Sequence, residues 1–184
     1  MTRLELLSVE DGVYRALRAE IGRLELAPGR RLPLEELEEI QALRLGLETF
    51  LARHGAERCT EAALGEMVAA RTEMEQAFED GDLDAYIASF WSLRDACYRC
   101  AHRPHLARAL EDQRIRVERY ILFLCGDAAA FANLRRGPDT LLEACRARDG
   151  DAAEAATHDA LLWVLAELQL LLGEHAPAEA RSAP

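Results

Sequence analysis

The amino-acid sequence predicts an all-α fold: an antiparallel bundle of about seven helices joined by short connections. Half of its 184 residues are hydrophobic. Alanine, leucine, glutamate and arginine dominate while β-branched residues are sparse, a composition typical of helical proteins. Apolar residues recur at steps of three and four, whereas no useful length of the chain alternates with period two. A chain of this length is expected to form one full core.

The first three helices follow from their start and stop signals. A helix is predicted over residues 11–24, and a long one over about 35–54, which Gly55 ends. Another begins at the cap residue Thr60 and ends at Asp80-Gly81. The residues expected to face inward on these helices are Val13, Leu17, Ile21, Leu37, Ile40, Leu43, Leu47, Phe50, Leu51, Leu64, Met67, Val68, Met74 and Phe78.

Residues 82–103 form the most informative helix of the chain. Asp82 caps it and Pro104 stops it. Arg94 lies four residues after Phe90, beside the apolar stripe of this helix, where a guanidinium must be paired or must meet an anion. This helix therefore predicts a binding pocket. Its inward stripe is Tyr86, Phe90, Leu93, Cys97 and Ala101.

Four further helices are predicted, over residues 105–125, 128–134, 139–148 and 152–172. The first of them has a broad apolar face. That face is made of Leu106, Leu110, Ile115, Val117, Ile121, Leu122 and Leu124.

Residues 13–32 resemble the opening of the winged helix-turn-helix of GntR-family regulators, because a Leu-Ala-Pro-Gly turn at 26–29 follows the helix at the right distance. The recognition helix and β-wing of that family do not follow. Instead, residues 37–48 resemble the start of the FCD effector domain of the FadR subgroup. Later landmarks of that domain are matched by Gly81-Asp82, Arg103-Pro104 and residues 144–155.

The resemblance implies an FCD-like bundle descended from a repressor that has lost its DNA-reading head. It divides the chain into an N-terminal helix and turn over residues 1–33 and the bundle over 34–173, and the composition of residues 174–184 predicts a disordered tail.

The resemblance also implies a pocket that differs from that of its relatives. Many family members hold a divalent metal with an aspartate, a histidine four residues later and two further histidines. The matching positions are Phe90, Arg94, about Pro138 and Ala160. None of these is the expected ligand, and the positive charge of Arg94 opposes a metal. We therefore expect no metal and no other cofactor; a slip of two residues in this alignment brings in only His158.

Arg44 matches the pocket arginine of the family, and Arg94 replaces a metal ligand. Two guanidiniums suit a carboxylate or phosphate, although Glu48 and Asp95 are close enough in sequence to pair with them instead. The aromatic residues among the ligand-binding candidates are equally compatible with a buried core, and Arg116 is equally compatible with a solvent-exposed face. The full set of candidate ligand-binding residues is Arg44, Tyr86, Phe90, Arg94, Cys97, Tyr98, Arg116, Tyr120 and Trp163.

Charge and composition exclude several function classes. A net charge of −11 argues against nucleic-acid binding. The chain has no lysine, which excludes Schiff-base and lysine-base mechanisms. No stretch is apolar enough for a signal peptide or a membrane span, so we expect a cytoplasmic protein. Its five cysteines suggest buried thiols, and the single C-x-x-C of Cys97 and Cys100 is weak evidence for redox or metal chemistry.

Three functions remain open from the sequence. The first is a metal-independent, homodimeric domain that binds an organic acid or aromatic metabolite as a sensor or carrier. The second is a metal-free cyclase, isomerase or lyase of specialised metabolism that reuses the pocket, with Arg94 and His158 as catalytic residues. The third is a partner that pairs with a full-length regulator. The absence of a readable catalytic constellation favours binding.

Overall fold

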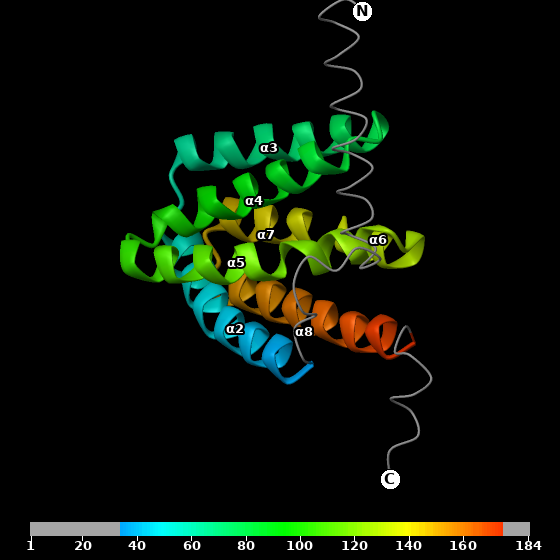
Figure 1. The fold of residues 1–184 in the computed structure, drawn as a ribbon. Coiled ribbons are helices and arrows are strands. Elements are labelled where there is room, and N and C mark those ends of the chain that lie inside the picture. Colours follow the sequence, from blue (N-terminus) through cyan, green and yellow to red (C-terminus); the bar gives the residue numbers. More distant parts are fainter. Residues whose placement is uncertain (1–33, 175–184) are drawn as a thin grey trace, which may run out of the picture.

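The computed structural model describes residues 34–174, which form seven α-helices joined by short turns and, within that range, no strand (Figure 1). This confirms the predicted all-α bundle. The helix predicted over residues 11–24 and most of the predicted tail lie outside the described residues. The helices are α2 (Leu34–Glu57), α3 (Glu61–Glu79), α4 (Leu83–Cys100), α5 (Pro104–Cys125), α6 (Ala128–Leu134), α7 (Gly137–Ala147) and α8 (Gly150–Glu174).

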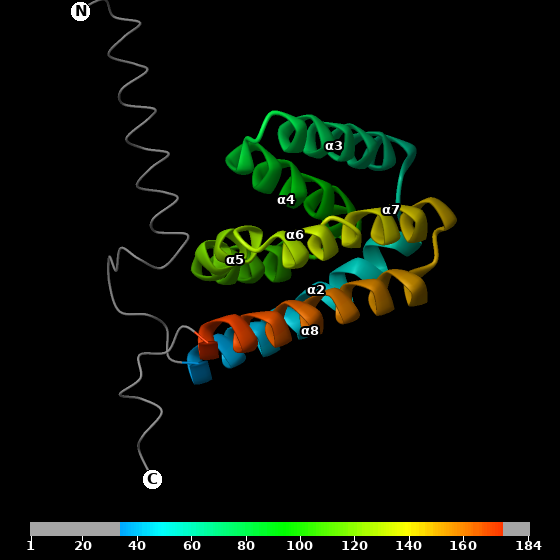
Figure 2. The same ribbon diagram turned by 90° about the vertical axis from the view of Figure 1, so that its right-hand side faces the viewer.

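The helices are arranged in three layers. The α3–α4 pair forms one layer, α5, α6 and α7 form the middle one, and α2 lies beside α8 in the third (Figures 1 and 2). The pair α2 and α8 is antiparallel, because Arg53 donates to Glu154 at 2.6 Å near one end. Gln169 donates to Glu38 at 2.8 Å near the other. Helices from the two ends of the described chain therefore lie side by side in this layer.

Most helix starts agree with the signals in the sequence. The side chains of Thr60 and Asp82 accept hydrogen bonds from backbone N–H groups in the first turns of α3 and α4, at 3.1 and 3.0 Å. Pro104 occupies the first turn of α5, where its missing N–H is harmless. Both predicted caps are confirmed.

Gly55 does not end α2, which continues to Glu57. A Cβ on Gly55 would lie 2.3 Å from the carbonyl oxygen of Cys97 on α4. Gly55 therefore does not act as a helix stop. Its missing side chain lets α2 and α4 approach closely.

The core contains the whole stripe predicted on α4, from Tyr86 to Ala101. The stripes predicted on α2, α3 and α5 were too wide, because each helix buries only the side that meets its neighbours. The residues wrongly placed inside, with their exposed fractions, are Leu43 (54%), Phe50 (38%), Val68 (42%), Phe78 (40%) and Ile115 (66%). Within residues 34–174, none of the helices combines the length and apolar character needed to cross a membrane.

Candidate ligand-binding site

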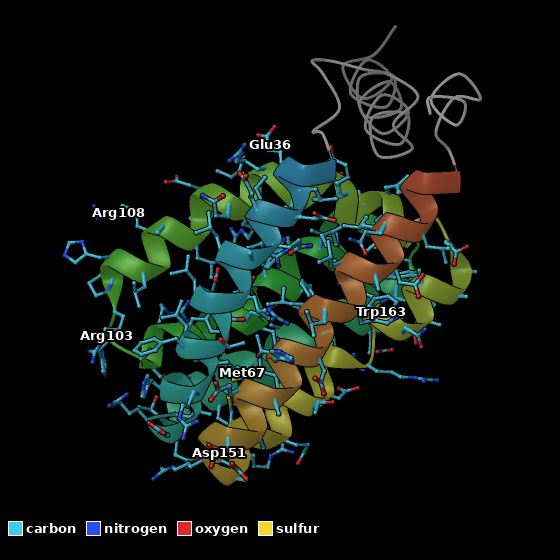
Figure 3. The ribbon with its side chains drawn as sticks, turned by 90° about the horizontal axis from the view of Figure 1, so that it is seen from below. Glu36, Met67, Arg103, Arg108, Asp151 and Trp163 are labelled. Carbon is cyan, nitrogen blue, oxygen red and sulfur yellow. The ribbon has the colours of Figure 1, made fainter. Side chains whose placement is uncertain are left out.

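A cavity of about 410 Å³ lies between the layers and is lined by residues from α2 and from α4 to α8. Most of its lining is aliphatic or aromatic. Trp163 lies on the side of α8 that faces away from α2 (Figure 3). The charged and aromatic lining residues are Arg44, Phe90, Arg94, Arg136, Asp159 and Trp163, and the polar ones are Asn133 and Thr140. This composition suits a small molecule with an apolar body and a polar end.

Glu48 is the centre of a buried hydrogen-bonded cluster at the wall of this cavity. From the preceding turn of α2, Arg44 donates from Nε to Oε1 of Glu48 at 2.8 Å. From α4, Arg94 donates to Oε2 from Nε at 3.2 Å and from Nη2 at 3.0 Å. The hydroxyl of Tyr98 donates to the same oxygen at 2.8 Å. Gln41 accepts a hydrogen bond from Arg44 Nη1 at 3.1 Å. We call these five residues the Glu48 cluster.

The Glu48 carboxyl is held in its ionised form. Burial opposes this, but the charges of Arg44 and Arg94 and the hydrogen bond from Tyr98 outweigh burial and lower its pKa below 4.5. The pKa of Arg94 is raised, because its interactions with Tyr98 and Glu48 outweigh its own burial. Burial raises the pKa of the Tyr98 hydroxyl well above 10.0, so Tyr98 acts as a neutral donor.

The Glu48 cluster carries one positive charge in excess. Arg44 and Arg94 are 2% and 4% exposed, and Glu48 is fully buried. Within residues 34–174, Glu48 is the only carboxylate that pairs with either arginine. Asp95, the other predicted counterion, instead accepts from Arg114 at 2.9 Å. Because an uncompensated buried charge is costly, the cluster favours an anion in the adjoining cavity.

Both arginines keep donors available for such an anion. The hydrogen bonds formed within residues 34–174 leave Nη2 of Arg44 and Nη1 of Arg94 without a protein acceptor. Neither nitrogen is completely buried without a hydrogen-bond partner. The guanidinium of Arg94 lies 5.5 Å from the ring centroid of Phe90, and that of Arg44 lies 5.5 Å from the ring of Trp91. These aromatic faces hold the two forks in place.

Four of the predicted ligand-binding residues line the cavity: Arg44, Phe90, Arg94 and Trp163. Tyr98 belongs to the Glu48 cluster behind the lining. The remaining four lie elsewhere among the described residues: Tyr86, Cys97 and Tyr120 are buried outside the lining, and the exposed Arg116 forms an ion pair with Glu36.

His158, the predicted acid–base residue, is 46% exposed and lies outside the cavity lining. Its Nδ1 lies 3.2 Å from Oδ1 of the neighbouring Asp159. The structure thus brings Asp159, rather than His158, to the cavity.

The lining residues that were not predicted from the sequence come mainly from the later helices. Arg136, Asn133 and Thr140 belong to α6, α7 and the turn between them, and no local pattern distinguishes them from surface polar residues.

The cavity residues do not fit a divalent metal. Phe90, Arg94 and Ala160, which match metal-ligand positions by sequence, all line the cavity, while Pro138 follows the lining residue Gly137. None of the four is a metal ligand, and two guanidiniums repel a dication. Across residues 34–174, no group of three or more histidine, cysteine, aspartate or glutamate side chains is placed to hold a metal ion.

The C-x-x-C pair is part of the core. Cys97 and Cys100 are free thiols and both are buried. A hydrogen bond with Cys145 and burial raise the pKa of the Cys97 thiol well above 9.0, so it lacks the thiolate character of a redox-active cysteine.

Comparisons with known proteins agree with this fold. The FCD domain family model matches residues 39–162. Among solved structures, E. coli McbR/YncC is similar with a TM-score of 0.66 and 22% sequence identity, over 89% of this chain and 99% of that chain. No curated protein is detectably similar in sequence.

Proposed function

This chain belongs to the FCD domain family, and we propose that it is a metal-independent binding domain for a small organic anion. FCD domains are effector domains of GntR-type regulators and typically bind small molecules. The observation that carries the proposal is the Glu48 cluster: two buried guanidiniums share one carboxylate at the wall of a mostly apolar cavity of about 410 Å³.

The ligand's anionic group is placed against Arg44 and Arg94. Each arginine has one end fixed by Glu48, so its planar fork is already oriented and loses little freedom when the anion binds. The rest of the ligand occupies the part of the cavity lined by residues such as Phe90, Leu161 and Trp163. A carboxylate with an aliphatic or aromatic body matches both requirements.

Binding is favoured over turnover by the position of the ionisable groups. His158, the one predicted acid–base residue, is half exposed and outside the lining. The groups that dominate the cavity wall are arginines, which do not release protons near neutral pH.

We also propose that the chain is a cytoplasmic homodimer that does not bind DNA by itself. Its net charge of −11 opposes contact with phosphates. Large apolar side chains on α2 and α8 are exposed and provide a surface for a second copy. They are Leu43, Phe50, Leu162 and Leu170.

Isothermal titration with octanoate and 2-naphthoate, an aliphatic and an aromatic carboxylate, tests the binding proposal. The wild-type protein should bind at least one of them saturably. Arg44→Gln and Arg94→Gln should each lower the affinity by about tenfold or more, since a hydrogen bond to a charged group is lost.

Arg116→Gln is the matched control, because it removes an exposed guanidinium that lies outside the cavity. This variant should bind like the wild type. The proposal fails if both cavity variants keep wild-type affinity, or if neither carboxylate binds the wild-type protein. Native mass spectrometry of the freshly purified protein then gives the mass of any copurifying compound.

A further inference from the structure

The number of charges at the cavity wall defines the ligand more narrowly. Two buried guanidiniums contribute two positive charges, and Glu48 cancels one of them. Arg136 and Asp159, the other charged lining residues, are of opposite sign and both exposed, so water screens their charges. One positive charge is left to be neutralised by the ligand.

We infer that Glu48 is a specificity-determining residue that restricts the cavity to ligands with a single negative charge in the head group. The inference rests on the proposed function and adds the charge class to it. Glu48 contacts both arginines from behind the lining, so it acts on the ligand through them. It is a positioning residue and not a group that touches the ligand.

The buried position of Glu48 gives this selection its strength. Charges interact more strongly inside a protein than in water. A single anionic group neutralises the excess charge of the cluster. A second charge on the same group finds no further counterion in the Glu48 cluster and lies close to the Glu48 carboxylate, which is fully buried and therefore poorly screened. Desolvating that second charge is unfavourable.

The Glu48 cluster also supplies less positive charge than a divalent metal would. A divalent cation suits ligands with several carboxylates, because it supplies two charges and several coordination positions. The Glu48 cluster supplies one net charge and two accessible nitrogens, Nη2 of Arg44 and Nη1 of Arg94. Two donors can serve the two oxygens of one carboxylate or sulfonate group.

A matched pair of probes tests the inference. 1-Octanesulfonate and 1-octylphosphonate have the same tail and tetrahedral heads of similar size, but at alkaline pH the phosphonate carries two charges. Titration calorimetry below the micelle-forming concentrations should show that the wild-type protein binds the sulfonate about tenfold more tightly or better, a difference of about 1.4 kcal/mol. At a pH where the phosphonate carries one charge, the preference should largely disappear.

Glu48→Gln keeps the shape of the side chain and leaves two positive charges, so it should shift the ratio of the two affinities toward the dianion by about tenfold. Glu143→Gln is the control, since it removes an exposed carboxylate outside the cavity, and the ratio should not change. If Glu48→Gln does not fold, Arg44→Gln serves instead. It leaves no net charge on the cluster, so it should weaken the dianionic phosphonate more than the sulfonate and widen the ratio of the two affinities.

Two results separate this inference from the binding proposal. Equal affinity of the wild-type protein for both probes at alkaline pH, with both still dependent on Arg94, overturns the selection by charge and leaves anion binding intact. Failure of both probes and of both carboxylates to bind the wild-type protein overturns the binding proposal itself.

Discussion

Glu48 is the residue on which the interior of the bundle depends most. It accepts hydrogen bonds from Arg44 on its own helix and from Arg94 and Tyr98 on α4. Removing it leaves two guanidiniums buried without a counterion. Breaking a buried ion pair in this way costs far more than the pair itself contributes.

Glu48→Leu is therefore expected to lower the free energy of unfolding by about 3–5 kcal/mol. Urea denaturation followed by circular dichroism measures this change. Glu143→Leu removes an exposed carboxylate whose one ion pair within residues 34–174 is with Arg146, three residues later, and should leave the unfolding midpoint unchanged. Equal midpoints for the wild type and Glu48→Leu would show that the cluster does not stabilise the fold.

Glu48 should also contribute to the acid sensitivity of the protein. Its pKa in the folded state lies below the ordinary value of 4.5, so its stabilising effect is fully present above that value. The effect is lost as pH falls through the lower, folded-state pKa. The difference in unfolding free energy between wild type and Glu48→Gln should shrink as the pH falls below 4.5. A difference that is constant with pH would contradict the ionised state of Glu48.

Only half of the Glu48 cluster could be predicted from the sequence. Arg44 and Glu48 are four residues apart on one helix, a spacing that brings side chains together. Arg94 is 46 residues from Glu48, and no local rule connects them; its neighbour Asp95 was the partner that the sequence offered. The packing of α2 against α4 decides between the two, and that packing depends on the whole bundle.

At the scale of the elements, the contact between α2 and α4 positions both arginines. Gly55 permits this contact, because any side chain there would collide with the carbonyl group of Cys97. Cys97 is one turn from Arg94 on α4, so a displacement of α4 at this point also displaces the cavity wall.

Gly55→Ala is expected to destabilise the protein by about 1–3 kcal/mol through this overpacking, and to weaken carboxylate binding. Thermal unfolding and calorimetry give the two quantities. Gly46→Ala is the control on the same helix, since a Cβ added at Gly46 would meet nothing within 4 Å. It should stabilise the protein by up to about 1 kcal/mol through helix propensity alone. A neutral Gly55→Ala would contradict the close packing.

The same glycine shows where prediction of elements from sequence stops. Periodicity and caps gave the correct order and type of the helices within residues 34–174, since those signals are local. Gly55 has the local properties of a helix stop. In the folded protein it lies inside α2 instead, because the close packing against α4 requires a residue without a side chain. Exposed residues such as Leu43 and Ile115 fit the apolar period and still lie outside the core, because the width of the buried face depends on neighbouring helices.

At the scale of the whole molecule, the family landmarks predicted the bundle, while the composition of the cavity was beyond the sequence. Arg94 was identified from one helix, but the cavity is closed by α6, α7 and α8. Their lining residues, such as Thr140 and Ala156, are ordinary helix residues when considered locally. Only the assembled layers give them a common surface.

The whole chain is expected to be a homodimer. Light scattering during size-exclusion chromatography should give twice the chain mass of 20.5 kDa. Leu43→Glu combined with Leu162→Glu places charges among the exposed apolar side chains of α2 and α8 and should shift the protein toward the monomer. A wild-type protein that is monomeric at high concentration would contradict the dimer.

The central claim is that the two buried arginines hold the anionic group of the ligand. A crystal structure with 6-bromo-2-naphthoate tests it most directly, because anomalous scattering from bromine locates the ligand without ambiguity. We predict the carboxylate within hydrogen-bond distance of Arg44 Nη2 and Arg94 Nη1, with the ring system toward Trp163. A carboxylate bound only to Arg136, or a ligand outside the cavity, would contradict this claim.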